Sequence, residues 1–180
     1  MKQFYKKYAY SAIVACKGTG LFPSVMLAQA ALESGYNTSV LSSKYNNFFG
    51  IKANNYTGRT VNLSTGEVIN GKKETINSNF RVYKSATESF TDRNKFLKTN
   101  ARYKSVFTAK TPEEQCNELQ KAGYATAQNY ANTLIKIINE NNLKTIDKRM
   151  IMNVKIDIVL AILFFCIALL NIAKITGYLK

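Results

Sequence analysis

Glu33 is the residue of this chain whose type and position best suit acid–base chemistry. It stands near the end of residues 23–35, which the sequence predicts to be a short helix, with Pro23 in its first turn and Gly35 closing its last turn. Apolar residues recur at helical spacing along this segment and form one stripe, in which Gln29 is the one polar member. Partial burial and the negative end of a helix both raise a glutamate pKa, as a general acid requires near neutral pH. The helix alone also fits an ordinary solvated glutamate, so the surrounding sequence must decide.

Other catalytic chemistries are excluded by composition. The chain contains no histidine, which excludes Ser-His-Asp and Cys-His catalysis and most zinc hydrolase sites within it. Cys16, Cys116 and Cys166 form no CxxC pair and are interpreted as small buried hydrophobic residues. Acid–base chemistry must therefore come from carboxylates, Tyr or Lys, and we expect neither a metal nor another cofactor.

Four sequence words carry a resemblance to a known family. Residues 28–35 read AQAALESG, residues 46–52 read NNFFGIK, residues 79–83 read NFRVY and residues 123–131 read GYATAQNYA. Together they resemble the glucosaminidase domain of glycoside hydrolase family 73, over about residues 4–141. In that family the Glu of AQAALESG is the catalytic acid, which the resemblance assigns to Glu33. The activity implied is that of an endo-β-N-acetylglucosaminidase, which cleaves the β-1,4 bond after N-acetylglucosamine in peptidoglycan.

The same resemblance implies further site residues. Tyr130 corresponds to a tyrosine that lines the family's site, although the family's Asp-Pro pair before it is replaced here by Ala127 and Gln128. The family's NNLFGIK word implies that Asn47, Phe48 and Phe49 contact substrate, and Tyr124 is expected to do so as well. A core position for these aromatic residues is the alternative.

The second carboxylate of a glycosidase is expected in residues 53–84. Glu67 stands four residues before Gly71, as in the family's TEYxxG word, and is preferred over Glu74, which lies beside two lysines. Inverting, retaining and substrate-assisted mechanisms all remain open at this point, because the separation of the two carboxylates is not encoded in the sequence.

The elements expected to position these residues are mainly helical. A first helix is predicted before residue 17. A β-lobe of two or three short strands is predicted in residues 53–84, where Thr, Val, Asn and Gly dominate. Further helices are predicted at residues 85–98, 111–123 and 128–141. Capping boxes begin at Ser85 and Thr111. We therefore expect an α+β, lysozyme-like fold that is mainly helical, with residues 1–145 as the glucosaminidase domain.

The C-terminal tail differs in composition. Residues 146–155 are predicted to be a basic linker and residues 156–176 a transmembrane helix, since Ile158 to Ala173 contain one polar residue, Asn171. A buried helix that packs on the domain is the alternative. The basic residues before the span predict that the domain lies on the cytoplasmic side. The N-terminal apolar run is short and polar, so no N-terminal signal peptide is expected.

Charge and domain organisation together limit the function. The formal net charge of +14 suits a polyanionic partner, but the basic residues are scattered and no nucleic-acid-binding motif is present, so nucleic acid is not expected. We predict a membrane-anchored enzyme that binds the peptidoglycan glycan strand. A phage lysis enzyme is one kind of protein that fits this description. The alternatives are a muramidase or lytic transglycosylase on the same fold, and a non-catalytic membrane-anchored wall-binding protein.

Overall fold

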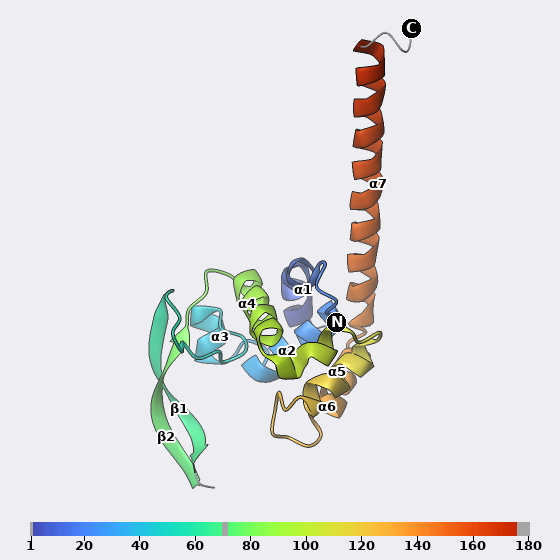
Figure 1. Cartoon of the computed structure of the whole chain (residues 1–180). Coiled ribbons are helices and arrows are strands. Elements are labelled where there is room, and N and C mark those ends of the chain that lie inside the picture. Colours follow the sequence, from blue (N-terminus) through green and yellow to red (C-terminus); the bar gives the residue numbers. More distant parts are fainter. Residues whose placement is uncertain (1, 70–71, 176–180) are drawn as a thin grey trace.

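The computed structural model describes residues 2–69 and 72–175. It consists of a helical body, a long β-hairpin on one side of the body and a helix that extends away from it (Figure 1). Along the chain, the elements are α1 (Gln3–Cys16), α2 (Pro23–Ser34), α3 (Val40–Tyr45), β1 (Thr60–Ile69), β2 (Lys72–Arg81), α4 (Ala86–Thr99), the 3-10 helix η1 (Ala101–Phe107), α5 (Pro112–Lys121), α6 (Tyr130–Glu140) and α7 (Lys144–Ile175). The expected architecture, mainly helical with a small β-lobe, is confirmed.

Helix α2 is the centre of the helical body and packs against α1, α5, α6 and α7. Pro23 occupies its first turn, and Gly35 ends it in the left-handed conformation with φ of 57°. Every residue from Pro23 to Ala31 is buried, whereas Leu32 is 37% exposed. The helix is therefore buried on all sides rather than along one stripe, because its many small side chains let neighbouring helices approach closely.

The predicted capping boxes set the beginnings of two helices. The Ser85 hydroxyl accepts from the Glu88 N–H at 3.2 Å, and the Thr111 hydroxyl accepts from the Glu114 N–H at 3.1 Å. Each glutamate carboxylate also accepts from a backbone N–H in front of the helix. These bonds satisfy N–H groups that have no partner within the helix, so α4 and α5 begin where the sequence indicates.

The β-lobe is a single hairpin with strands longer than expected. Strands β1 and β2 pair antiparallel from Thr60 opposite Arg81 to Ile69 opposite Lys72. The described residues contain two strands of ten residues each, in place of two or three short ones. Figure 1 shows that only the base of the hairpin lies against the body.

Helix α7 begins as part of the helical body. Ile146 and Asp147 are buried, and Asp147 Oδ1 accepts from the backbone N–H of Ser24 in the first turn of α2 at 2.8 Å. Residues 146–155, predicted to be a basic linker, lie within this helix, whose first turn has apolar and polar contacts with the body. The division between domain and linker at residue 145 remains a prediction.

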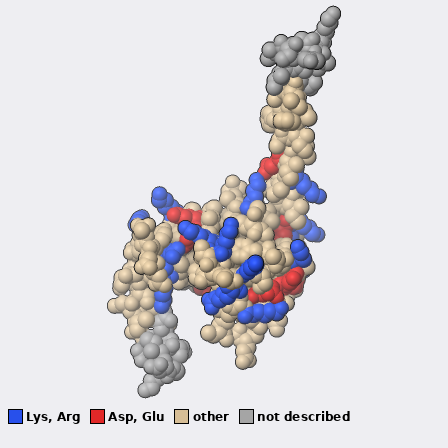
Figure 2. Space-filling model, viewed as in Figure 1, with Lys and Arg blue, Asp and Glu red and all other residues tan. Residues whose placement is uncertain are grey.

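The outer part of α7 has an apolar surface. Large apolar side chains from Ile151 to Leu169 are exposed, and the helix is long and apolar enough to cross a membrane. Figure 2 shows charged side chains over the body and around the base of this helix, and none on its described outer part. By length and composition, α7 is a candidate membrane-spanning helix.

Candidate active site

Glu33 lies near the C-terminal end of α2, where its side chain opens to solvent. Its Oε1 accepts a hydrogen bond from the Tyr130 hydroxyl at 2.8 Å. Surrounding protein displaces water from the carboxyl group and raises its pKa above the ordinary value, while the bond from Tyr130 and the positive charge of Arg93 oppose that rise. Glu33 is therefore an acid that keeps its proton to a higher pH than an ordinary glutamate while remaining accessible from solvent.

Behind Glu33, a chain of buried polar groups leads into the body. Tyr130 is 4% exposed, and its oxygen accepts from Gln29 Nε2 at 2.8 Å. Gln29 is fully buried, and its Oε1 accepts from the guanidinium of Arg93. Burial, followed by the neighbouring Tyr124 and Glu33, raises the pKa of Tyr130, so its hydroxyl stays protonated and acts as a hydrogen-bond donor.

Tyr124 stacks on Tyr130 at the edge of this site. The two ring centroids are 5.7 Å apart with an interplanar angle of 21°. Burial raises the pKa of Tyr124 to about 12, against a lowering by the charge of Arg93. The phenol is thus neutral across the physiological range and presents an aromatic ring beside the acid.

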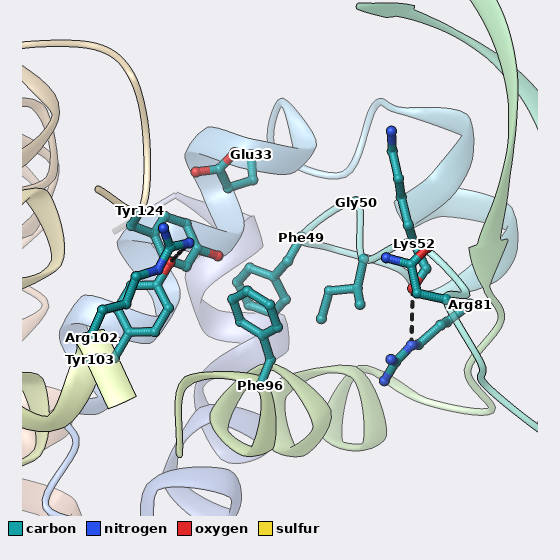
Figure 3. Close-up of a pocket in the computed structure, with 11 residues that line it drawn as sticks. Glu33, Phe49, Gly50, Lys52, Arg81, Phe96, Arg102, Tyr103 and Tyr124 are labelled. Atoms are coloured by element: carbon teal, nitrogen blue, oxygen red, sulfur yellow. Dashed lines mark hydrogen bonds between the residues drawn. The ribbon is translucent and has the colours of Figure 1, made fainter. Parts of the chain in front are cut away.

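The cleft into which Glu33 opens has a volume of about 390 Å³. Figure 3 shows Glu33 at its rim, with Tyr103, Arg102 and Tyr124 on one side and Lys52 and Arg81 on the other. Its floor carries the rings of Phe49 and Phe96, and the remaining lining residues are Gly50, Ile51 and Asn54. Aromatic faces bind the apolar faces of sugar rings, and the cations suit an anionic polymer.

The side of the cleft that carries Lys52 and Arg81 is held in place by bonds at the base of the hairpin. Arg81 Nη1 pairs with Asp92 at 2.8 Å, and Arg81 Nε donates to the carbonyl oxygen of Lys52 at 3.1 Å. The Tyr83 hydroxyl donates to the same Asp92 carboxylate at 2.6 Å. These bonds join β2 to α4 and fix where the hairpin leaves the body.

The structure brings four of the predicted site residues together. Glu33, Phe49 and Tyr124 line the cleft, and Tyr130 bonds to Glu33. Among the lining residues, Glu33 is the one carboxylate, and the described part of the chain holds no group of three or more Asp, Glu, Cys or His side chains suited to a metal ion.

Asn47 and Phe48, which the sequence predicts to contact substrate, are buried and are not among the residues that line this cleft. Asn47 is 1% exposed; its amide donates to the carbonyl oxygens of Ile51 and Arg81 at 3.0 and 2.9 Å and accepts from the Ile51 N–H at 3.0 Å. Phe48 is fully buried, and its ring centroid lies 4.8 Å from that of Tyr8 in the core. Both residues shape the loop that presents Phe49, because buried amide and aromatic groups satisfy the backbone and fill the core there.

Glu67 lies in β1, directly opposite Glu74 in β2. The side chains of both residues lie outside the described part of the chain. The choice between the two glutamates as second carboxylate therefore stays a prediction.

Several cleft residues were not predicted from sequence. Lys52, Phe96 and Arg102 line the cleft, and Arg93 ends the buried chain behind Glu33. Lys52 belongs to the NNFFGIK word, so that word carried a signal for it. Arg93 had no such signal, since an arginine in a predicted amphipathic helix is ordinarily solvated.

The fold and the site together define a class. A helical body with a β-hairpin beside the cleft, and a carboxylic acid of raised pKa at the end of a central helix, is the arrangement of lysozyme-like glycoside hydrolases.

Comparison with known proteins identifies the family. A family model described as mannosyl-glycoprotein endo-beta-N-acetylglucosaminidase matches residues 9–143. Peptidoglycan hydrolase FlgJ of Salmonella typhimurium is 35% identical over 144 residues, which are 77% of this chain and 46% of FlgJ. A probable N-acetylmuramidase of Lactococcus lactis subsp. lactis is 39% identical over 151 residues, 80% of this chain and 34% of that protein.

Solved structures agree with this result. The catalytic domain of the autolysin Auto from Listeria monocytogenes superposes with a TM-score of 0.71 and 36% identity, over 80% of this chain and 85% of that domain. This chain belongs to the glucosaminidase family, that of glycoside hydrolase family 73. It spans less than half the length of the two sequence relatives described above.

Proposed function

We propose that this chain is a peptidoglycan hydrolase that cleaves the β-1,4 glycosidic bond after N-acetylglucosamine. The observation that supports it most strongly is Glu33, a carboxyl of raised pKa that opens into an aromatic and cationic cleft. Cleavage requires a proton for the leaving oxygen, and Glu33 supplies it as general acid. The basic lining, with Lys52, Arg81 and Arg102, favours an anionic wall polymer.

Glu67 is the proposed second carboxylate, on the basis of its spacing from Gly71. It stabilises the oxocarbenium-like centre or activates the attacking water, depending on its separation from Glu33 when substrate is bound. Glu74, its partner across the hairpin, is the competing candidate. If substitution of Glu67 and substitution of Glu74 both leave activity unchanged, the acetamido group of the substrate itself takes the role of the second carboxylate.

Tyr130 is proposed to act at the site through its hydroxyl. The hydroxyl donates to Glu33 Oε1 at 2.8 Å, which holds the carboxyl group in one orientation. A second proposed role for the hydroxyl is to orient the 2-acetamido group or a water near the reacting carbon. The change of the family's Asp-Pro to Ala127 and Gln128 has left this hydrogen bond in place.

Helix α7 is proposed to anchor the enzyme in a membrane. Its exposed apolar side chains lie along one helix from Ile151 to Leu169, and lipid is the environment that removes them from water. Lys17 of the body pairs with Asp157 of the helix, which neutralises the acidic residue next to the apolar run. The lysines that flank the run suit the headgroup layers.

Product analysis of digested peptidoglycan tests the activity. After borohydride reduction, the released fragments should carry reduced N-acetylglucosamine ends. Reduced muramic acid ends would identify a muramidase, the activity that the Lactococcus relative is named for. Anhydro ends would identify a lytic transglycosylase, and the absence of fragments would support a non-catalytic wall-binding protein.

A further inference from the structure

Arg93 is a buried cation for which the described residues provide no carboxylate partner. It lies on α4, is 1% exposed, and belongs to none of the ion pairs of the described residues. Its Nη1 donates to Asn94 Oδ1 at 3.0 Å, and its Nε has no partner in the described part of the chain. A buried guanidinium that is not paired with an anion is costly to stability. We therefore look for the role of Arg93 in its hydrogen bonds rather than in the stability of the fold.

The bond from Arg93 to Gln29 determines the direction of every hydrogen bond that follows it. A guanidinium only donates, so the atom of Gln29 that faces Arg93 must be its acceptor, Oε1. The amide nitrogen then faces Tyr130 and donates to its oxygen at 2.8 Å. Since that oxygen accepts from Gln29, the hydroxyl proton of Tyr130 is directed to Glu33 Oε1.

The last bond has a consequence for the reacting acid. Glu33 Oε1 is occupied as an acceptor of the Tyr130 proton, so the acidic proton of the neutral carboxyl group is left on Oε2. A general acid must carry its proton on the oxygen that meets the leaving group. The direction of the buried chain thus selects one of the two carboxyl oxygens.

We propose that Arg93 is a positioning residue, which fixes the direction of the chain Arg93–Gln29–Tyr130–Glu33 and so keeps the catalytic proton on Glu33 Oε2. The inference rests on the proposed function, because it assigns Glu33 as the acid. Without a donor at Arg93, the Gln29 amide can turn by half a rotation at equal volume. Tyr130 then donates to Gln29 Oε1, and Glu33 Oε1 receives no hydrogen bond.

The charge of Arg93 acts in the same direction as the bond it sets up. It opposes the rise in the pKa of Glu33. Its guanidinium lies 5.9 Å from the ring centroid of Phe49 and 6.0 Å from that of Tyr124, whose faces partly stabilise a cation. Contacts with these two rings therefore partly stabilise the Arg93 cation near the cleft.

The test follows the Glu33 carboxyl group directly, by carbon-13 NMR titration of the full chain in detergent micelles. The Glu33 signal is identified by its loss in Glu33→Gln. Arg93→Met should raise the Glu33 midpoint by about one pH unit, because both the charge and the Tyr130 bond are lost. Arg93→Lys, which retains a donor-only cation, should restore most of the shift. Lys98→Met, which removes an exposed cation from the same helix, should leave the midpoint unchanged.

A cycle with Tyr130→Phe separates positioning from packing. In the wild-type chain Tyr130→Phe should raise the Glu33 midpoint, and in the Arg93→Met background it should add little, since the bond is already gone. If Arg93→Met does not fold, Gln29→Glu replaces it: the new carboxylate pairs with Arg93 and takes the Tyr130 proton, so Tyr130→Phe should again add nothing. Additive shifts, or an unchanged midpoint in a folded Arg93→Met, would overturn the proposal. A wild-type chain that shows these midpoints but releases no fragments would count against the proposed function alone.

Discussion

Replacing Glu33 with glutamine should abolish turnover and, at neutral pH, stabilise the fold. The folded-state pKa of Glu33 lies above its ordinary value because surrounding protein disfavours the charged form. A group of this kind contributes stability that is fully present below its unfolded pKa and is lost as pH rises through its folded pKa. Glutamine resembles the protonated state and still accepts from Tyr130, so the variant avoids this loss.

The size of the effect follows from the exposure of the site. Each unit by which a folded-state pKa exceeds the unfolded-state pKa corresponds to about 1.4 kcal/mol, and screening by the solvent at this open side chain reduces the gain below that rate. For a chain of this size, each 1 kcal/mol of gain raises the midpoint of thermal unfolding by about 2–4 °C. Turnover of peptidoglycan should fall by about 10²–10⁴-fold, the share of an acid–base group.

Both quantities can be measured on one preparation. Urea unfolding at pH 3 and pH 7 should show equal stability of the two proteins at pH 3 and an advantage of the variant at pH 7. Glu140→Gln is the matched control, since its exposed pair with Lys136, at 3.8 Å, contributes little. A variant less stable than wild type at pH 7 would refute the account of the raised pKa. Retention of more than about a tenth of the activity would refute Glu33 as the acid.

Three further predictions concern the hairpin, the loop and the tail. Glu67→Gln should reduce turnover far more than Glu74→Gln, and the reverse order would move the second carboxylate to Glu74. Asn47→Ala should destabilise the fold by about 2–4 kcal/mol in urea unfolding, because it leaves buried backbone groups without partners, with kcat unchanged at low temperature. A loss of kcat at unchanged stability would instead return Asn47 to the site. Carbonate-washed membranes should retain the full chain and release one truncated after Asp147; protease added to spheroplasts should spare the domain, as the positive-inside tendency predicts.

The helical elements were predictable because local chemistry determines them. Pro23 and Gly35 set the ends of α2, and the Ser85 and Thr111 caps set the beginnings of α4 and α5. Each signal acts within one helical turn, so the sequence carries it without knowledge of the tertiary structure. The same holds for Glu33, whose position at a helix end follows from that helix alone.

The exposure of a side chain in a loop was not predictable in the same way. Asn47, Phe48 and Phe49 are consecutive residues of one sequence word, yet only Phe49 lines the cleft. Which of them turns inward depends on Arg81 and Ile51, whose carbonyl oxygens bind the Asn47 amide across 34 and 4 residues. Arg93 is a second example, because its burial is set by α2 and the cleft aromatics rather than by its own helix.

The contact between α7 and α2 relates the anchor to the direction of the cleft. Asp147 binds the N–H of Ser24 in the first turn of α2, whereas Glu33 lies nine residues further on, about 14 Å along the helix axis. Figure 1 shows that α7 and the hairpin extend from the body in opposite directions. Because Ile146 and Asp147 are buried, the helix meets the body through a packed joint instead of a flexible linker. The buried contact of the proposed anchor and the proposed acid therefore lie toward opposite ends of α2.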